Sequence, residues 1–196
     1  YLLLAWAAYA ALLLLLARRP ADRGASAQPT DSAALVAGHL GFAGIIALFG
    51  ARLLLGHPLA YGLTTGLAAQ GTPGEWPVFN LMGLTNLAVI LVLAGLWPRL
   101  RTAEERLVYA LAVYQLTLGW LWQELSMLPH GGDYVILAWA VAATTVLVAV
   151  QRWRAAPAVF AALARPLALS AHSTLASLGV LLALRIATGP DGTLAI

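Results

Sequence analysis

Cysteine and lysine are both missing from this chain of 196 residues. Without cysteine there are no disulfides, no thiolate metal ligands and no thiol nucleophiles, and the redox compartment is left open. Without lysine there is no Schiff base, which excludes a retinal protein of the rhodopsin type. The basic residues are all arginine, a bias typical of a GC-rich genome, so the net charge of +3 does not indicate a nucleic-acid partner.

Charged residues are scarce and apolar residues abundant. Only 10% of the residues are charged and 61% are hydrophobic, and the mean hydropathy of +0.83 exceeds what the core of a soluble domain requires. Helices are favoured because a strand in lipid leaves its backbone groups unpaired, and the alternation typical of a membrane barrel is missing. The sequence therefore predicts an all-α integral membrane protein, a single domain over residues 1–196.

The apolar segments predict a bundle of six transmembrane helices with short loops, because about 20 apolar residues cross a bilayer. We place the spans at about 1–17, 33–56, 77–97, 107–128, 134–150 and 166–188. The first segment could also be the core of a signal peptide. It has no basic region before it and no small-residue cleavage site after it, so we interpret it as a span. Pro166 is expected in the first turn of the last span.

The arginines alternate between loops. Nine of the eleven follow spans one, three and five, namely Arg18, Arg19, Arg23, Arg99, Arg101, Arg106, Arg152, Arg154 and Arg165. The other two loops carry Glu75 and Asp133 and no arginine. The positive-inside rule then places both ends of the sequence on the non-cytoplasmic side. We expect the protein in a bacterial cytoplasmic membrane.

Short local patterns predict how two of the helices begin and pack. Thr102 and Glu105 have the spacing of a capping box, so a helix should start there on the cytoplasmic side. Gly38, Gly41 and Gly44 give the second span a face of small residues, which lets another helix approach closely, within one chain or between chains.

Two histidines within spans could bind a cofactor. His39 and His172 each precede an arginine by thirteen residues, Arg52 and Arg185, a spacing that reflects either an internal repeat or coincidence. Both histidines should lie at one depth near the cytoplasmic face. They could be the axial ligands of one b-type haem. Alternatively, each is hydrogen-bonded to serine, backbone or water, with Ser170, Ser173 and Thr174 beside the second histidine.

The two outer loops bring together imidazoles and carboxylates. His57, Glu75, His130 and Asp133 have a composition suited to zinc or copper. They follow no ligand-spacing motif, and glycine and proline beside the histidines are equally typical of turns. Two interpretations of these four residues therefore stand: a metal site, or ordinary turns.

Glu124 is an acidic residue inside a predicted span, about one turn from its outer end. Because an ionised carboxylate at this depth needs a partner, we expect it to pair with Arg52 or Arg185. The alternative is that span four ends early, near Trp122, which leaves Glu124 in the polar interface.

No enzyme motif is present: the sequence has no phosphate-binding glycine loop, no His-Glu-x-x-His and no Gly-x-Ser-x-Gly. The short loops leave no room for a soluble catalytic unit. We therefore expect a non-catalytic subunit or assembly partner of a larger membrane complex, in contact with the lipid bilayer and with other membrane subunits. The alternatives are a redox protein binding haem through His39 and His172, and a small transporter or channel.

Overall fold

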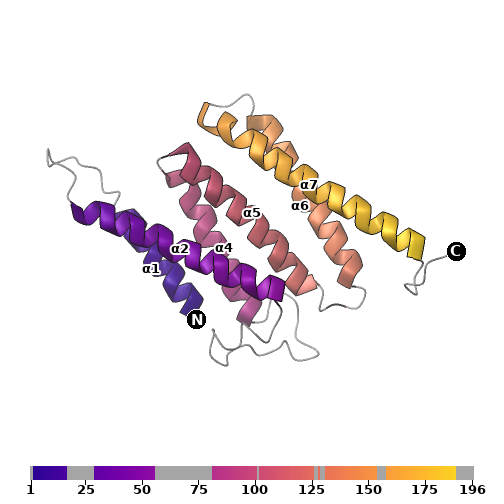
Figure 1. The fold of residues 1–196 in the computed structure, drawn as a ribbon, viewed down its shortest axis with the longest axis horizontal. Coiled ribbons are helices and arrows are strands. Elements are labelled where there is room, and N and C mark those ends of the chain that lie inside the picture. The colour runs from indigo at the N-terminus through magenta and orange to yellow at the C-terminus, as the bar shows by residue number, and fades with distance from the viewer. Residues whose placement is uncertain are drawn as a thin grey trace.

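The computed structural model describes residues 2–16, 29–55, 81–100, 102–125, 128, 131–153 and 158–188. Within these ranges the chain forms six α-helices, one short 3-10 helix and no strands, which confirms the predicted all-helical fold (Figure 1). The elements are α1 (Leu2–Leu16), α2 (Pro29–Leu55), α4 (Leu81–Leu96), η1 (Trp97–Arg99), α5 (Ala103–Leu125), α6 (Gly131–Trp153) and α7 (Ala158–Thr188).

The beginning of α7 differs from the prediction. The helix starts at Ala158, so Pro166 lies inside it and not in its first turn. A proline inside a helix removes one backbone hydrogen bond and crowds the preceding turn. Leu163 and Leu167, on either side of the proline, are both buried in one apolar cluster. This packing holds the helix together across the proline.

Helix length and composition provide a test of membrane crossing. Two stretches are long and apolar enough to cross a membrane, Gly132–Arg152 in α6 and Leu163–Leu184 in α7. Shorter apolar stretches occur at Ala5–Leu15, Ala33–Leu48 and Gly83–Arg99. The structure thus contains two candidate spans within its described residues, and the six-span bundle stays a prediction.

Helix α5 occupies the middle of the bundle. It packs against α2 and α4 on one side and against α6 and α7 on the other, while α1 packs against α2 and α4. Consecutive helices run in opposite directions (Figure 1). Gly38 and Gly41 face α1, where ideal Cβ atoms would lie 2.7 Å from Leu14 Cγ and 3.0 Å from Ala10 Cβ, respectively. These two glycines allow α1 and α2 to pack closely.

The apolar core is divided along the two sides of α5. The larger cluster joins α1, α2, α4 and α5 around Phe42, Ile45 and Leu93. Two smaller clusters join α5, α6 and α7, around Ala143 with Ala171 and around Val150 with Leu163.

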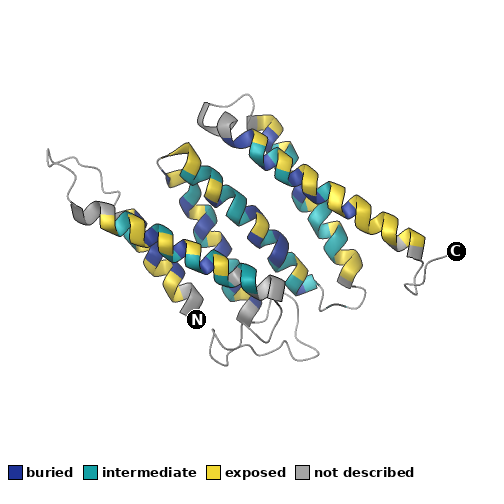
Figure 2. Ribbon diagram, viewed as in Figure 1, coloured by how far each residue is buried: buried dark blue, intermediate teal, exposed yellow. Residues whose placement is uncertain are grey.

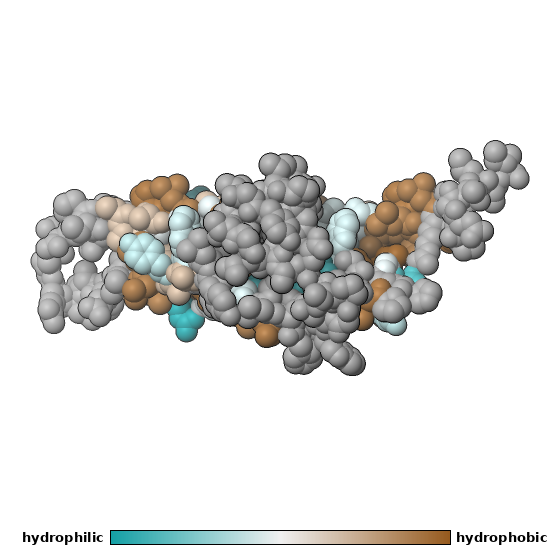
Figure 3. Space-filling model, turned by 90° about the horizontal axis from the view of Figure 1, so that it is seen from below, coloured by the Kyte–Doolittle hydropathy of each residue, from teal (hydrophilic) through white to brown (hydrophobic). Residues whose placement is uncertain are grey.

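Large apolar side chains are also exposed on many helices. Figure 2 shows exposed residues along much of the second half of α7. Seen from below in Figure 3, hydrophobic residues are exposed on both sides of the view. A protein that exposes this much apolar surface requires an apolar environment or partners to cover it.

Candidate functional site

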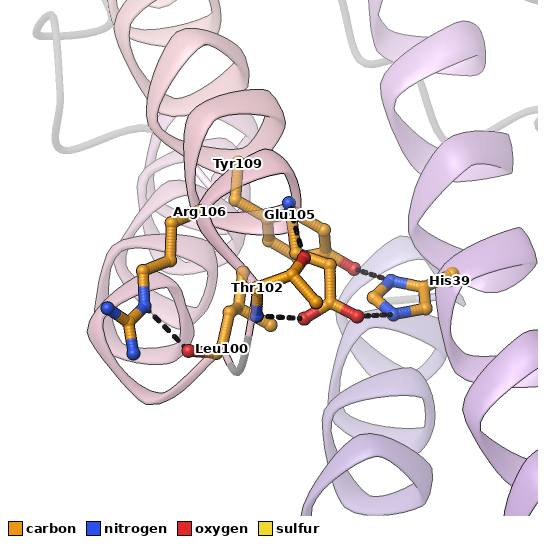
Figure 4. A network of polar contacts seen from close by, with 6 residues as sticks. All are labelled: His39, Leu100, Thr102, Glu105, Arg106 and Tyr109. Carbon is orange, nitrogen blue, oxygen red and sulfur yellow. Dashed lines mark hydrogen bonds and ion pairs between the residues drawn. The ribbon is translucent and has the colours of Figure 1, made fainter. Parts of the chain in front are cut away.

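A polar network joins α2 to the beginning of α5 (Figure 4). The predicted capping box is confirmed: the Glu105 backbone N–H donates to Thr102 Oγ1 at 3.1 Å, and the Thr102 N–H donates to Glu105 Oε2 at 3.4 Å. Glu105 Oε1 also lies 3.3 Å from His39 Nε2. One carboxylate therefore caps α5 and contacts α2.

The second ring nitrogen of His39 meets a buried tyrosine. His39 Nδ1 lies 2.9 Å from the Tyr109 hydroxyl, and the tyrosine ring also packs edge-to-face against Phe42. The contact of Nε2 with Glu105 is electrostatic and not a well-directed hydrogen bond. The imidazole, whose side chain is 27% exposed, thus has an oxygen beside each ring nitrogen. This arrangement ties α2 to α5 and leaves neither nitrogen aimed at a metal.

The structure does not bring His39 and His172 together. Within the described residues, the backbones of α2 and α7 do not approach each other closely, and His172 is exposed on α7. Their depths differ too: His39 is level with Tyr109, whereas Thr174, two residues after His172, is level with Tyr114. Because α5 and α7 run in the same direction, His172 lies about three residues, or roughly 4.5 Å, farther along the bundle axis than His39. The geometry does not support one haem held by both histidines.

The side chains expected to satisfy His172 have other partners. Ser170 Oγ accepts from Gln115 Nε2 at 2.9 Å, and Thr174 Oγ1 accepts from the Tyr114 hydroxyl at 2.9 Å. Ser173 donates to the Ser170 carbonyl at 2.8 Å. In the sequence, this connection corresponds to two hydroxyl residues four positions apart, Ser170 and Thr174, and to two adjacent polar residues, Tyr114 and Gln115. These contacts fix the register of α7 on α5.

The predicted outer metal site falls mostly outside the described residues. His57, Glu75 and His130 lie there, and Asp133 is exposed in the first turn of α6. Among the residues that the structure describes, no three His, Cys, Asp or Glu side chains are grouped to hold a metal. The site built from these four residues stays a prediction.

Glu124 is fully buried near the end of α5, with 0% of its surface exposed. The helix continues to Leu125, and the alternative that the membrane span ends near Trp122 stays a prediction. The carboxyl group packs on Gly83 of α4, where an ideal Cβ would lie 2.7 Å from Cδ, Oε1 and Oε2. Arg52 and Arg185 lie on α2 and α7 with side chains outside the described set, so their pairing with Glu124 stays a prediction.

Other polar groups surround Glu124. Asn86, 2% exposed, donates its amide to Gln123 Oε1 at 3.2 Å. Trp120 donates its indole N–H to the Gly83 carbonyl at 3.0 Å, so this tryptophan serves as an interhelical donor. We call Gly83, Asn86, Trp120, Gln123 and Glu124 the buried polar cluster. It joins α4 to α5 and could stabilise the bundle or hold a polar group.

The chemistry of these sites is that of interhelical hydrogen bonding and charge burial. Each polar network joins α5 to a different neighbour: α2 through His39, α4 through Asn86 and α7 through Thr174. Compared with models of known protein families, with curated proteins and with solved structures, the chain matches none.

Proposed function

We propose that the chain is an integral membrane protein of six transmembrane helices, in a bacterial cytoplasmic membrane, with both ends of this sequence on the non-cytoplasmic side. Two lines of support converge. Consecutive helices are antiparallel (Figure 1), as such a topology requires. Trp97 of η1 packs against the apolar cluster that contains Leu163 of α7, which supports placing the ends of the bundle that carry Arg99 and Arg165 on the same side. The positive-inside rule assigns this end to the cytoplasm.

This topology has a direct test in the absence of native cysteine. We expect single cysteines near Arg23, Arg101 or Arg154 to be protected from an impermeant thiol reagent in right-side-out membranes. Cysteines near Gly71 or Gly132 should be labelled, because their loops face the opposite side. The measurement is the labelled fraction before and after permeabilisation, and labelling of the arginine loops in sealed membranes would reverse the orientation.

Within the membrane the protein serves as a non-catalytic subunit or assembly partner of a larger complex. The observation that carries this proposal is the second half of α7. Its apolar side chains Val180, Leu181, Leu182, Leu184 and Ile186 are exposed around the whole helix, with Ile186 81% exposed. A helix that is apolar on every side lies in lipid or is covered by protein. The polar networks, by contrast, hold the helices of this chain to one another.

The subunit role is tested by site-specific photocrosslinking in intact membranes. A photoreactive residue at Leu181 should crosslink to a different membrane protein, identified by mass spectrometry after purification in mild detergent. The matched control is Leu137 on α6, a leucine that is 63% exposed against 49% for Leu181, and it should react mainly with lipid. If both positions give only lipid adducts, the protein acts without partners on this surface and the proposed role is wrong.

A further inference from the structure

Two exposed arginines lie at the same end of the hairpin formed by α6 and α7. Arg152 is in the last turn of α6, and Arg165 is in the first half of α7. Val150 and Leu163 belong to one apolar cluster, so the end of α6 and the beginning of α7 lie together, as Figure 1 also shows. The hairpin therefore carries two cations at one end.

Both arginines lie at the edge of a candidate membrane span. Arg152 is the last residue of the span Gly132–Arg152, and Arg165 is the third residue of the span Leu163–Leu184. Long arginine side chains near the end of a span extend to the headgroup region. In the topology proposed above this edge faces the cytoplasmic leaflet, whose anionic lipids attract basic side chains.

An exposed apolar side chain lies one helical turn deeper in the span than each arginine. Val148 precedes Arg152 by four residues, Leu169 follows Arg165 by four residues, and both apolar side chains are exposed. Residues four apart lie on the same face of a helix. Each helix thus presents a cation at the edge of the span and an apolar side chain beneath it. This is the order of headgroup and acyl chain in a phospholipid.

The charge around the two hairpin arginines is uncompensated within their own helices. The only acidic residue of α6 and α7 is Asp133, in the first turn of α6 at the opposite end of the hairpin. Among the described residues, none forms a hydrogen bond or ion pair with either arginine. By contrast, Arg99 and Arg106 donate to the backbone carbonyls of Gly95 and Leu100. The hairpin arginines are therefore the ones placed to bind an anion from outside the chain.

We propose that this end of the hairpin binds an anionic phospholipid of the cytoplasmic leaflet. Arg152 and Arg165 donate charge-assisted hydrogen bonds to the headgroup phosphate, a group that guanidinium fits well. The acyl chains lie along Val148 and Leu169, which favours a lipid over a soluble phosphate because a soluble phosphate would use the arginines alone. Basic sites between transmembrane helices on the cytoplasmic side bind anionic headgroups in the same way. The inference rests on the membrane topology proposed above and adds a ligand to it.

Native mass spectrometry of the full chain in a neutral detergent tests this site. The protein is mixed with equal amounts of phosphatidylglycerol, which is anionic, and phosphatidylcholine, which has no net charge, both with the same acyl chains. We expect the protein to retain phosphatidylglycerol preferentially. Arg152→Gln combined with Arg165→Gln should lower its apparent affinity about fivefold for each arginine removed and leave phosphatidylcholine binding unchanged. Arg152→Lys combined with Arg165→Lys keeps the charge and should keep most of the affinity.

The matched control is Arg99→Gln combined with Arg106→Gln, which removes the same charge from the same end of the bundle. This control should keep the preference for phosphatidylglycerol. An equal loss of preference in the control would show that general surface charge attracts the lipid, and would overturn the site on the hairpin. The proposal is also wrong if the unmodified protein retains both lipids equally. Displacement of the lipid by glycerol phosphate, which has the headgroup chemistry and no acyl chains, would likewise overturn it.

The cysteine labelling described above separates this proposal from the proposed function. Lipid competition in detergent does not depend on which way the chain faces in the membrane. If the loop cysteines show the expected topology and the lipid preference is missing, the lipid site is wrong and the topology stands. If the arginine loops are labelled in sealed membranes, the topology is wrong and so is the assignment of the lipid to the cytoplasmic leaflet.

Discussion

Gly83→Ala should destabilise the protein by about 2 kcal/mol, the usual size for overpacking a filled interior. The added Cβ would lie 2.7 Å from the carboxyl atoms of Glu124. A carboxyl group ends a flexible side chain and could normally move aside, but Glu124 has no exposed surface into which it could turn. The free energy of unfolding in mixed detergent micelles measures the effect.

The control for Gly83→Ala is Gly95→Ala on the same helix. An ideal Cβ at Gly95 meets no heavy atom within 4 Å, so this substitution should be neutral or stabilising by up to about 1 kcal/mol through helix propensity. Placing Gly83→Ala in a Glu124→Ala background should remove most of its cost, because the clashing group is gone. An equal loss of stability from Gly83→Ala in both backgrounds would show that contact with Glu124 is not the reason why alanine is unfavourable at residue 83.

If Glu124 pairs with an arginine as expected, Glu124→Gln should destabilise the protein by about 3 kcal/mol, because the arginine would lose its counter-charge. The expected partner is Arg52 or Arg185. The substitution preserves the size of the side chain and removes its charge, so packing against Gly83 is kept. The same unfolding measurement applies, and the loss should exceed that of Glu104→Gln, which removes a charge from an exposed residue at the other end of α5.

A double-mutant cycle identifies the partner. Combining Glu124→Gln with Arg52→Gln, and separately with Arg185→Gln, should recover part of the loss for the arginine that forms the pair. Strictly additive losses for both arginines would mean that Glu124 is held by other groups, and that the charge-pairing expectation is wrong.

The helical fold could be predicted because its cause is local. Long apolar segments and the Thr102–Glu105 capping box determine where helices form, and both are read directly from composition and spacing. The beginning of α7 could not be predicted in this way. Pro166 is an equally good first-turn residue, and only the burial of Leu163 and Leu167 in one cluster decides that the helix continues through it.

The polar sites could not be predicted from the spacing of residues in the sequence, because they are formed by contacts between different helices. His39 and His172 look alike in sequence, yet one contacts Glu105 and Tyr109 while the other faces outward. The burial of Glu124 could be anticipated from the cost of its charge in a span. Its packing against Gly83 could not, because a glycine gives no signal of which side chain from another helix will fill the space beside it.

The central position of α5 implies an order of assembly. The larger apolar cluster draws on α1, α2, α4 and α5, together with Leu100 in the turn between the last two, and on none of the described residues of α6 or α7. The four earlier helices can therefore bury their main core while the last two are still being synthesised. We therefore expect the α6–α7 hairpin to dock last, onto a preformed surface of α5, where two contacts, Tyr114 to Thr174 and Gln115 to Ser170, join α7 to α5. Late docking leaves this hairpin as the unit that can detach by itself while the rest of the bundle stays folded.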